Sequence, residues 1–266
     1  MDVVILAAGM GSRLGSQSVL LPKCLVPVGG TPLLHRCLRQ LAGCGFCRVV
    51  IVTGHLSERV RSALSVNSAG LTVTTVQNGS YADTGTAASL CCAAPYVRSE
   101  FFLLLEGDLL FTSDFLVEAR RRSRWPAILA ADLSGSGDEV FVVTGLDGHL
   151  KELAKKPGSA SQKELMAGTA RICGELAGIS VLPRTFIDYL VSKTSRDPSC
   201  RRRDYESFIV EYSSKDPIKV HWLKGAPWTE IDTPRDLDRA HSIVLPLLKK
   251  QEGTERYGGT IPSNLE

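Results

Sequence analysis

Short apolar runs alternate with amphipathic stretches through the first half of the chain. The first run, "VVILAA" at residues 3–8, has the continuous apolar pattern of a strand that is buried on both faces. Runs of the same kind predict strands at residues 48–54, 71–78, 100–111 and 126–132. Apolar residues at helical spacing predict helices at residues 31–45, 57–64, 84–97 and 112–123. Because strands that alternate with helices form right-handed βαβ units, we expect an α/β fold with a Rossmann-like, mixed but mostly parallel sheet.

The pattern changes from about residue 133. The stretch "VFVVTGLDGHLKELAKK" predicts a hairpin that turns at "LDGH". Further strands are predicted at residues 171–183 and 218–223, and helices at residues 184–194, 204–213 and 233–250. We expect one domain over residues 1–250, with a core at about 1–132 and 216–250 and a small lid insertion at about 133–215. Residues 251–266 contain few large apolar side chains and are expected to form a flexible tail or linker.

Length and charge restrict the class of protein. The chain has 266 residues, which is long enough for one large α/β domain. Its net charge of +3 is too small to indicate a nucleic-acid partner. No apolar run approaches the roughly 20 residues of a membrane span, and residues 1–8 lack the basic start of a signal peptide. We therefore expect a cytoplasmic protein that acts on a small anionic substrate and binds neither nucleic acid nor a membrane. A homodimer and a fusion to a further enzyme domain both stay open.

The eight cysteines are expected to be reduced thiols rather than disulfides. Five lie within or beside apolar segments, where cysteine packs as a small hydrophobic side chain: Cys24, Cys37, Cys91, Cys92 and Cys173. Cys44 and Cys47 in "AGCGFC" have the spacing of a redox or zinc pair, but both roles need a context that the sequence lacks. We interpret this pair as part of a helix-to-strand connection.

The loop after the first strand, "LAAGMGSRL", has the small residues of a phosphate-binding turn. A P-loop needs a Gly-Lys pair, which the sequence does not contain, and Leu14 stands where a dinucleotide fingerprint needs its third glycine. Backbone N–H groups of a small-residue loop can approach a phosphate chain closely. We expect this role for Leu6, Ala7, Ala8, Gly9, Gly11 and Ser12. Arg13 can bind two phosphate oxygens at once, and Lys23 in "LPK" supplies a point charge. The alternative is an ordinary tight turn with solvated basic side chains.

These residues, "LAAGMGSRL…LPK", resemble the signature of the sugar-phosphate nucleotidyltransferase family, and the resemblance runs from residue 3 to about residue 245. Together with "YADTGTAASL" and "WTEID", the segments of the second half look most like the CTP-using cytidylyltransferases of 2-aminoethylphosphonate and phosphocholine. The resemblance implies CMP transfer from CTP to 2-aminoethylphosphonate, with phosphocholine, which would give CDP-choline, as the alternative acceptor. Hexose-phosphate members carry Gln-Pro-x-Gly-Thr-Ala where this chain has "ADTGTAA", so a sugar-1-phosphate acceptor and a catalytically inactive nucleotide-binding module are weaker alternatives.

Nucleotidyl transfer brings two anions together, and magnesium ions screen the repulsion between them. Mg²⁺ prefers carboxylate ligands. Asp108 follows a buried strand, and Glu230 and Asp232 are spaced so that both side chains can share one face of an extended segment. In line with the family pattern, we expect Asp108 and Asp232 to hold Mg²⁺, although a turn aspartate and a helix N-cap are the structural alternatives. The resemblance also implies that Arg13 holds the β- and γ-phosphates and that Lys23 stabilises the transition state; Arg13, Lys23 and Asp108 are the expected catalytic residues.

Two more groups of residues are candidates for binding the base and the acceptor. The start of the predicted helix at residues 84–97 offers hydroxyl and N–H groups to the nucleotide, or simply caps the helix: Thr84, Gly85, Thr86 and Ser89. A phosphonate needs a cation, and the Lys155-Lys156-Pro157 stretch resembles the Glu-Lys-Pro of the family, which makes Lys156 the candidate. An ammonium group needs a carboxylate or an aromatic face. Candidates are Asp138, Glu139, Tyr205, Glu206, Trp228 and Glu230.

Overall fold

A nine-stranded mixed sheet forms the centre of the computed structural model, which describes residues 1–15 and 20–250. Its N-terminal half consists of parallel strands in the order β6-β1-β4-β5, in which Ile5 pairs with Ile51 on one side and with Leu105 on the other. These strands are β1 (Asp2–Ala7), β4 (Arg48–Thr53), β5 (Thr72–Gln77) and β6 (Phe101–Glu106). Since their carboxyl ends lie at one edge, the loops that follow β1 and β6 meet there.

The other half of the sheet is built around one long strand, β11 (Ala170–Pro183). Along one side, β11 pairs first with β9 over residues 170–175 and then with β6 over residues 179–183. Between these two partners, Gly174 and Gly178 adopt positive φ, and the register shifts. The remaining strands of this half are β8 (Ala127–Ala131), β9 (Phe141–Gly145), β10 (Leu150–Ala154) and β12 (Lys219–Trp222).

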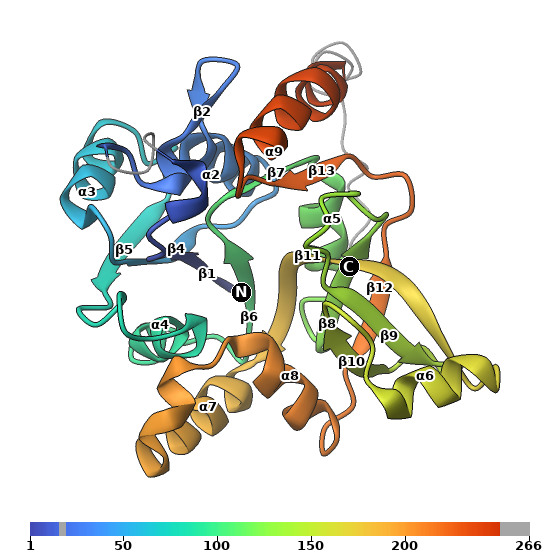
Figure 1. The fold of residues 1–266 in the computed structure, drawn as a ribbon. Coiled ribbons are helices and arrows are strands. Elements are labelled where there is room, and N and C mark those ends of the chain that lie inside the picture. The colour runs from blue at the N-terminus through green and yellow to red at the C-terminus, as the bar shows by residue number, and fades with distance from the viewer. Residues whose placement is uncertain (16–19, 251–266) are drawn as a thin grey trace.

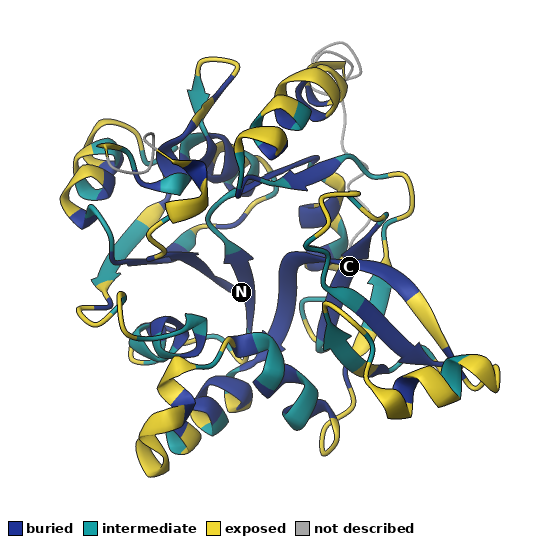
Figure 2. Ribbon diagram, viewed as in Figure 1, coloured by how far each residue is buried: buried dark blue, intermediate teal, exposed yellow. Residues whose placement is uncertain are grey.

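Helices cover both faces of the sheet (Figure 1). One face packs against α2 (Leu33–Gly43), α3 (Ser57–Val66) and α5 (Asp114–Arg121). The opposite face packs against α4 (Thr86–Ala93), α7 (Arg184–Arg196) and α8 (Tyr205–Ser213). Because successive strand residues point to opposite faces, Val3 and Ile5 lie in the first core and Val4 and Leu6 in the second. Figure 2 shows β1, β4, β6, β8 and β11 buried along most of their length between half-exposed helices, whereas the edge strands β5 and β12 are more exposed.

A smaller third core sits beside the sheet. It joins the antiparallel pair β7 (Leu109–Phe111) and β13 (Trp228–Glu230) to α9 (Pro234–Arg239), whose helical path continues to residue 250. The remaining short elements are η1 (Ser12–Leu14), η2 (Lys23–Leu25), β2 (Pro27–Val28), β3 (Thr31–Pro32), α6 (Ser159–Met166), η3 (Pro198–Arg202) and the π-helical turn η4 (Ala240–Val244). The β7–β13 pairing places residues 230–232 beside Asp108, whose carbonyl accepts a hydrogen bond from the Ile231 N–H at 3.0 Å.

The predicted mixed α/β fold is confirmed, with two local differences. Residues 100–111 form two strands rather than one, because the Gly107 N–H donates to the Leu6 carbonyl at 2.8 Å and the chain turns before β7. Helix α6 and strand β13 lie where no element was predicted. The predicted lid region contributes β9, β10 and β11 to the main sheet. The predicted tail at 251–266 lies outside the described residues. Within the described part of the chain, no helix is both long and apolar enough to cross a bilayer.

Candidate active site

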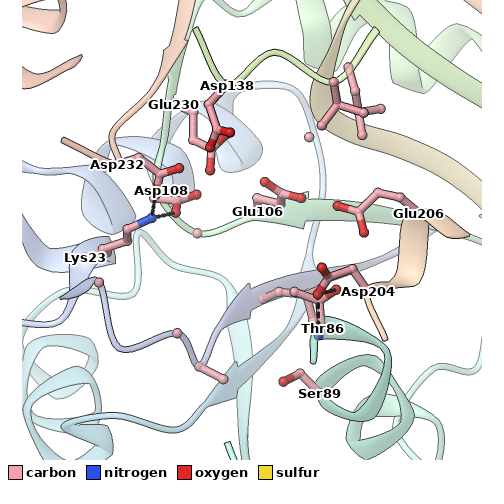
Figure 3. A pocket seen from close by; sticks show the side chains of 18 of the residues that line it. Lys23, Thr86, Ser89, Glu106, Asp108, Asp138, Asp204, Glu206, Glu230 and Asp232 are labelled. Carbon is pink, nitrogen blue, oxygen red and sulfur yellow. Dashed lines mark hydrogen bonds and ion pairs between the residues drawn. The ribbon is translucent and has the colours of Figure 1, made fainter. Parts of the chain in front are cut away.

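A cavity of about 650 Å³ opens where β9 and β6 separate along β11. Its lining comes from the loop after β1, the starts of α4 and α8, the turn after β6, the end of β10 and the segment after β13. More carboxylates than cationic side chains line it. In Figure 3 these carboxylates form a row that runs from Asp232 past Asp108 and Glu106 to Glu206. The cavity is therefore suited to a ligand that brings positive charge with it.

Lys23 lies between two carboxylates at one end of this row. Its Nζ donates to Asp108 Oδ2 at 2.8 Å and also to Asp232 Oδ1. The side chains of Lys23 and Asp108 are each 15% exposed, and that of Asp232 is 11% exposed. Burial lowers the pKa of Lys23, but the charges of Asp108 and Glu230 outweigh burial and hold this pKa above its ordinary value. Lys23 is therefore a fixed, partly desolvated positive charge.

Arg13 connects the same centre to the loop before β9. Its Nη2 donates to Asp232 Oδ2 and its Nη1 to Asp138 Oδ2, both at 2.5 Å. Lys155 also contacts Asp138, and Lys155 and Arg13 together hold the pKa of this carboxyl below its ordinary value. The guanidinium is half-exposed and Asp138 is 41% exposed, so Arg13 can exchange Asp138 for phosphate oxygens while it keeps its contact with the buried Asp232.

Glu106, Asp108 and Glu230 form a cluster with the geometry of a cation site. One oxygen from each carboxylate lies within 4.8 Å of the others. Burial, aided by neighbouring carboxylates, raises the pKa of Glu106 to about 8 and that of Glu230 to about 9. Asp108 Oδ1 is buried without a hydrogen-bond partner among the described residues. Hard oxygen ligands, mutual repulsion and an unpartnered buried oxygen all fit a divalent cation.

Of the predicted metal pair, Asp108 belongs to this cluster, and Asp232 contacts Lys23 and Arg13. Glu106 was not predicted, because it ends an apolar run that reads as a buried strand. The spacing of Glu106 and Asp108 in "LEGD" could have indicated it, because the side chains of residues two apart in an extended segment point to the same face.

The loop after β1 faces the cavity largely as expected. Leu6, Ala7, Ala8, Gly9 and Gly11 all line it, whereas Ser12 does not. At the start of α4, Thr86 and Ser89 line the cavity, whereas Thr84 and Gly85 do not.

The two residues before α4 have structural contacts instead. The Thr84 hydroxyl donates to the Ser80 carbonyl at 2.8 Å. Gly85 packs against the chain before α8: a Cβ at this position would lie 2.3 Å from the Arg203 carbonyl oxygen. The missing side chain at position 85 therefore makes room for a protein segment rather than for a base.

The starts of α4 and α8 are bonded to each other. Asp204 Oδ1 accepts hydrogen bonds from the Thr86 N–H at 3.3 Å and from the Thr86 hydroxyl at 3.2 Å. The Thr86 hydroxyl accepts in turn from the Tyr205 N–H at 2.9 Å. These bonds satisfy N–H groups that helix starts leave without a partner. They also fix the start of α8 relative to the start of α4 on the cavity wall.

Among the residues expected to bind the acceptor, Asp138, Glu206 and Glu230 line the cavity. Burial raises the pKa of Glu206 to about 7. Glu139 and Lys156 do not line it, and the neighbouring Lys155 does.

The two predicted aromatic residues lie behind the wall of the cavity. Tyr205 is fully buried, and its hydroxyl donates to Glu106 Oε1 at 2.7 Å. Trp228 is also buried, with its indole N–H directed to the Asp132 carbonyl at 3.3 Å. Both side chains support the site from behind and do not offer a face to a ligand.

A family model, the MobA-like NTP transferase domain, matches residues 3–172, from β1 into β11. The chain belongs to the MobA-like NTP transferase family. This agrees with the nucleotidyltransferase signature in the opening loop. In this NTP transferase domain, the matched residues include both the loop after β1 and the acidic turn after β6.

Known relatives and structures extend the comparison. The CMP-5'-(3-aminopropyl)phosphonate synthase of Streptomyces rubellomurinus is 44% identical over 271 residues; the match covers 97% of this chain and 42% of that protein, so the chain spans less than half of that relative. The structure of the inositol-1-phosphate CTP transferase from T. maritima covers 94% of this chain and 95% of its own, with a TM-score of 0.76 and 23% identity. The CTP:phosphocholine cytidylyltransferase from Streptococcus pneumoniae covers 91% of this chain and 98% of its own, with a TM-score of 0.71 and 19% identity. These two structures share the fold of this NTP transferase.

Several residues of the cavity were not among the candidates from the sequence. They are Cys24, Glu106, Gly107, Val140, Leu153, Ala154, Lys155, Glu175, Leu176, Gly178, Arg202, Arg203, Asp204 and Ser207. Most come from the second half of the NTP transferase chain, beyond the glycine-rich loop, where no local motif marks them.

Proposed function

We propose that the chain is a cytidylyltransferase domain that transfers CMP from CTP to a small aminoalkylphosphonate and releases pyrophosphate. The observation that carries this proposal is the arrangement of Lys23 beside the acidic cluster, in one cavity at the end of β1 and β6. A relative that is 44% identical is named for its CMP-aminopropylphosphonate product, which supports the choice of CTP and of the acceptor class. The proposed acceptors are 2-aminoethylphosphonate and 3-aminopropylphosphonate.

The nucleotide's phosphates would lie against the loop after β1. The N–H groups of this small-residue loop bind phosphate oxygens, and Arg13 adds a planar pair of donors. Mg²⁺ would be held by Asp108 with Glu106 and Glu230, and when bound it neutralises charge on the triphosphate and the attacking anion. Asp232 has a different role in this proposal, because it holds Lys23 and Arg13 in place.

The reaction needs no general base. A phosphonate oxygen is already ionised near neutral pH, so it attacks the α-phosphorus directly. One P–O bond forms between the acceptor and the α-phosphorus as the bond to the β-phosphate oxygen breaks, and pyrophosphate leaves. Lys23 bridges the α-phosphate and the attacking oxygen, and its charge stabilises the transition state without reorganisation because Asp108 and Asp232 already hold it.

Pyrophosphate release tests the proposal. The enzyme would be assayed with Mg²⁺ and each of CTP, UTP, ATP and dTTP, against 2-aminoethylphosphonate, 3-aminopropylphosphonate, phosphocholine and glucose-1-phosphate. We expect turnover with CTP and the aminoalkylphosphonates, and a CMP-phosphonate product by mass spectrometry. Turnover confined to glucose-1-phosphate, or none with any phosphonate, would contradict the proposal.

The cation cluster is tested separately by melting. Added Mg²⁺ should raise the melting temperature of the wild-type protein, because a cation relieves the repulsion among the three half-buried carboxylates. Glu230→Gln removes one ligand charge and should weaken this rise, whereas Glu139→Gln removes a charge outside the cavity and should leave it intact. An equal rise in the Glu230→Gln protein would place the metal elsewhere. EDTA should abolish turnover.

A further inference from the structure

One wall of the cavity presents a buried carboxylate oxygen without a hydrogen-bond partner, and the described residues that line the cavity include no aromatic side chain. Glu206, in the first turn of α8, lines the cavity, and in Figure 3 its carboxylate points toward Glu106 across the open space. Its Oε2 is buried and has no hydrogen-bond partner within the described part of the chain. Leaving a buried carboxylate oxygen without a donor is costly, so this oxygen marks a position where a ligand donor is missing.

The charges around Glu206 call for a cation. Burial, and after it the charges of Asp204 and Glu230, raise the pKa of Glu206, whereas a hydrogen bond to its own backbone and the charge of Lys155 lower it. Lys155, however, is paired with Asp138. Arg203, the basic residue that precedes Asp204, donates to Glu211 at 2.5 Å and stacks over the Phe208 ring. Lys155 and Arg203 are therefore each paired with a carboxylate other than Glu206.

The start of α8 is held rigidly, which suits a specific subsite. The Tyr205 hydroxyl fixes it to Glu106 at 2.7 Å, and Asp204 fixes it to Thr86. A side chain on such an anchored helix start loses little freedom when a ligand binds, and this increases the contribution of each contact.

From these observations we infer that Glu206 is the specificity-determining residue that receives the primary ammonium group of the acceptor. This inference rests on the proposed transfer of CMP to an aminoalkylphosphonate. The ammonium group donates to Glu206 Oε2 while the phosphonate end faces Lys23.

The lining also determines which kind of ammonium group fits. A quaternary ammonium has no N–H donor and is recognised by aromatic faces. None of the described residues that line the cavity is aromatic, and Tyr205 and Trp228 are buried behind it. The site therefore selects a primary ammonium over a trimethylammonium group.

Three matched acceptors test this inference on the wild-type enzyme. They are 2-aminoethylphosphonate, ethylphosphonate, which lacks the amine, and 2-(trimethylammonio)ethylphosphonate, which lacks N–H donors. A charge-assisted hydrogen bond predicts a kcat/KM for the amine about 10- to 100-fold above that of either analogue. Equal values for the three acceptors, or a preference for the trimethylated one, would overturn the inference.

The variant Glu206→Gln assigns the preference to this residue. It should reduce the ratio of kcat/KM for 2-aminoethylphosphonate to that for ethylphosphonate by about 10-fold or more, mainly through KM. Glu139→Gln, a charge removal outside the cavity, should keep the wild-type ratio. A wild-type ratio in Glu206→Gln would refute the role of Glu206 while leaving the proposed function intact. Absence of turnover with any phosphonate in the wild-type enzyme would instead refute the proposed function.

Discussion

Replacing Lys23 by methionine would remove the charge at the centre of the site while keeping an unbranched side chain. The variant leaves Asp108 and Asp232 facing each other without the ammonium group that holds them. Removing one partner of a fully buried ion pair costs about 3–5 kcal/mol. Lys23 is 15% exposed and Arg13 still binds Asp232, so we expect a loss of about 2 kcal/mol in the free energy of unfolding, below that range. For a chain of this size, such a loss lowers the melting temperature by about 4–8 °C.

The effect of Lys23→Met on catalysis should be larger. A preorganised donor to a developing charge contributes about 10²–10³ in kcat, so pyrophosphate release from CTP and an aminoalkylphosphonate should fall by at least that factor. Added Mg²⁺ should raise the melting temperature of the variant more than that of the wild-type protein, because a cation replaces the lost charge beside Asp108. Lys156→Met, at an exposed lysine outside the cavity, is the matched control and should behave as wild type. Near-normal turnover in Lys23→Met would refute the reasoning.

Three further predictions concern packing and reactivity. Gly85→Ala should destabilise the protein by about 1–3 kcal/mol in urea unfolding, because its Cβ meets backbone, whereas Gly79→Ala, with open space around it, should not. Tyr205→Phe removes the donor to a buried carboxylate oxygen and should cost about 1–3 kcal/mol by the same assay. Burial raises the pKa of Cys24 to about 12, so iodoacetamide at neutral pH should modify the exposed Cys47 and not Cys24, as peptide mass mapping would show.

Each of these has a clear contrary outcome. Equal stabilities for the two alanine variants would mean that the contact between the starts of α4 and α8 can relax at no cost. An unchanged unfolding midpoint in Tyr205→Phe would mean that water replaces the phenol. Modification of Cys24 at the rate of Cys47 would show that the cavity wall beside η2 opens to solvent.

The part of the site that comes from the first half of the chain was predictable, because short stretches of sequence define the strands that end there. Strands that end in small or acidic residues all end at the same edge of a parallel sheet, so the loop after β1 and Asp108 had to meet. Asp232 entered the candidate site through the family resemblance, and the structure places it in contact with Arg13 across a separation of 219 residues. Glu106 was missed because its position within an apolar run suggested a strand interior.

The acceptor side was less predictable because its geometry depends on details that periodicity does not carry. Strand β10 pairs with β9 through a register shift between Leu150 and Glu152, and after its end Lys155 rather than Lys156 lines the cavity. Helix α6 has one buried residue, Ser161, so its sequence lacks the apolar stripe from which a helix is predicted. Trp228 was predicted as a ligand-binding aromatic residue, but β13 pairs with β7 and the Trp228 side chain is buried in the core.

The path of β11 has a practical consequence for the limits of the folding unit. The family match ends at residue 172, yet β11 protects the edge of β6 only from residue 179 onward. A chain shortened to the family match would leave the N–H and C=O groups along that edge without a partner, and an open edge strand is a template for aggregation. The shortened chain would also expose the apolar face that α7 and α8 cover. The folding unit therefore extends beyond the residues that the family model matches.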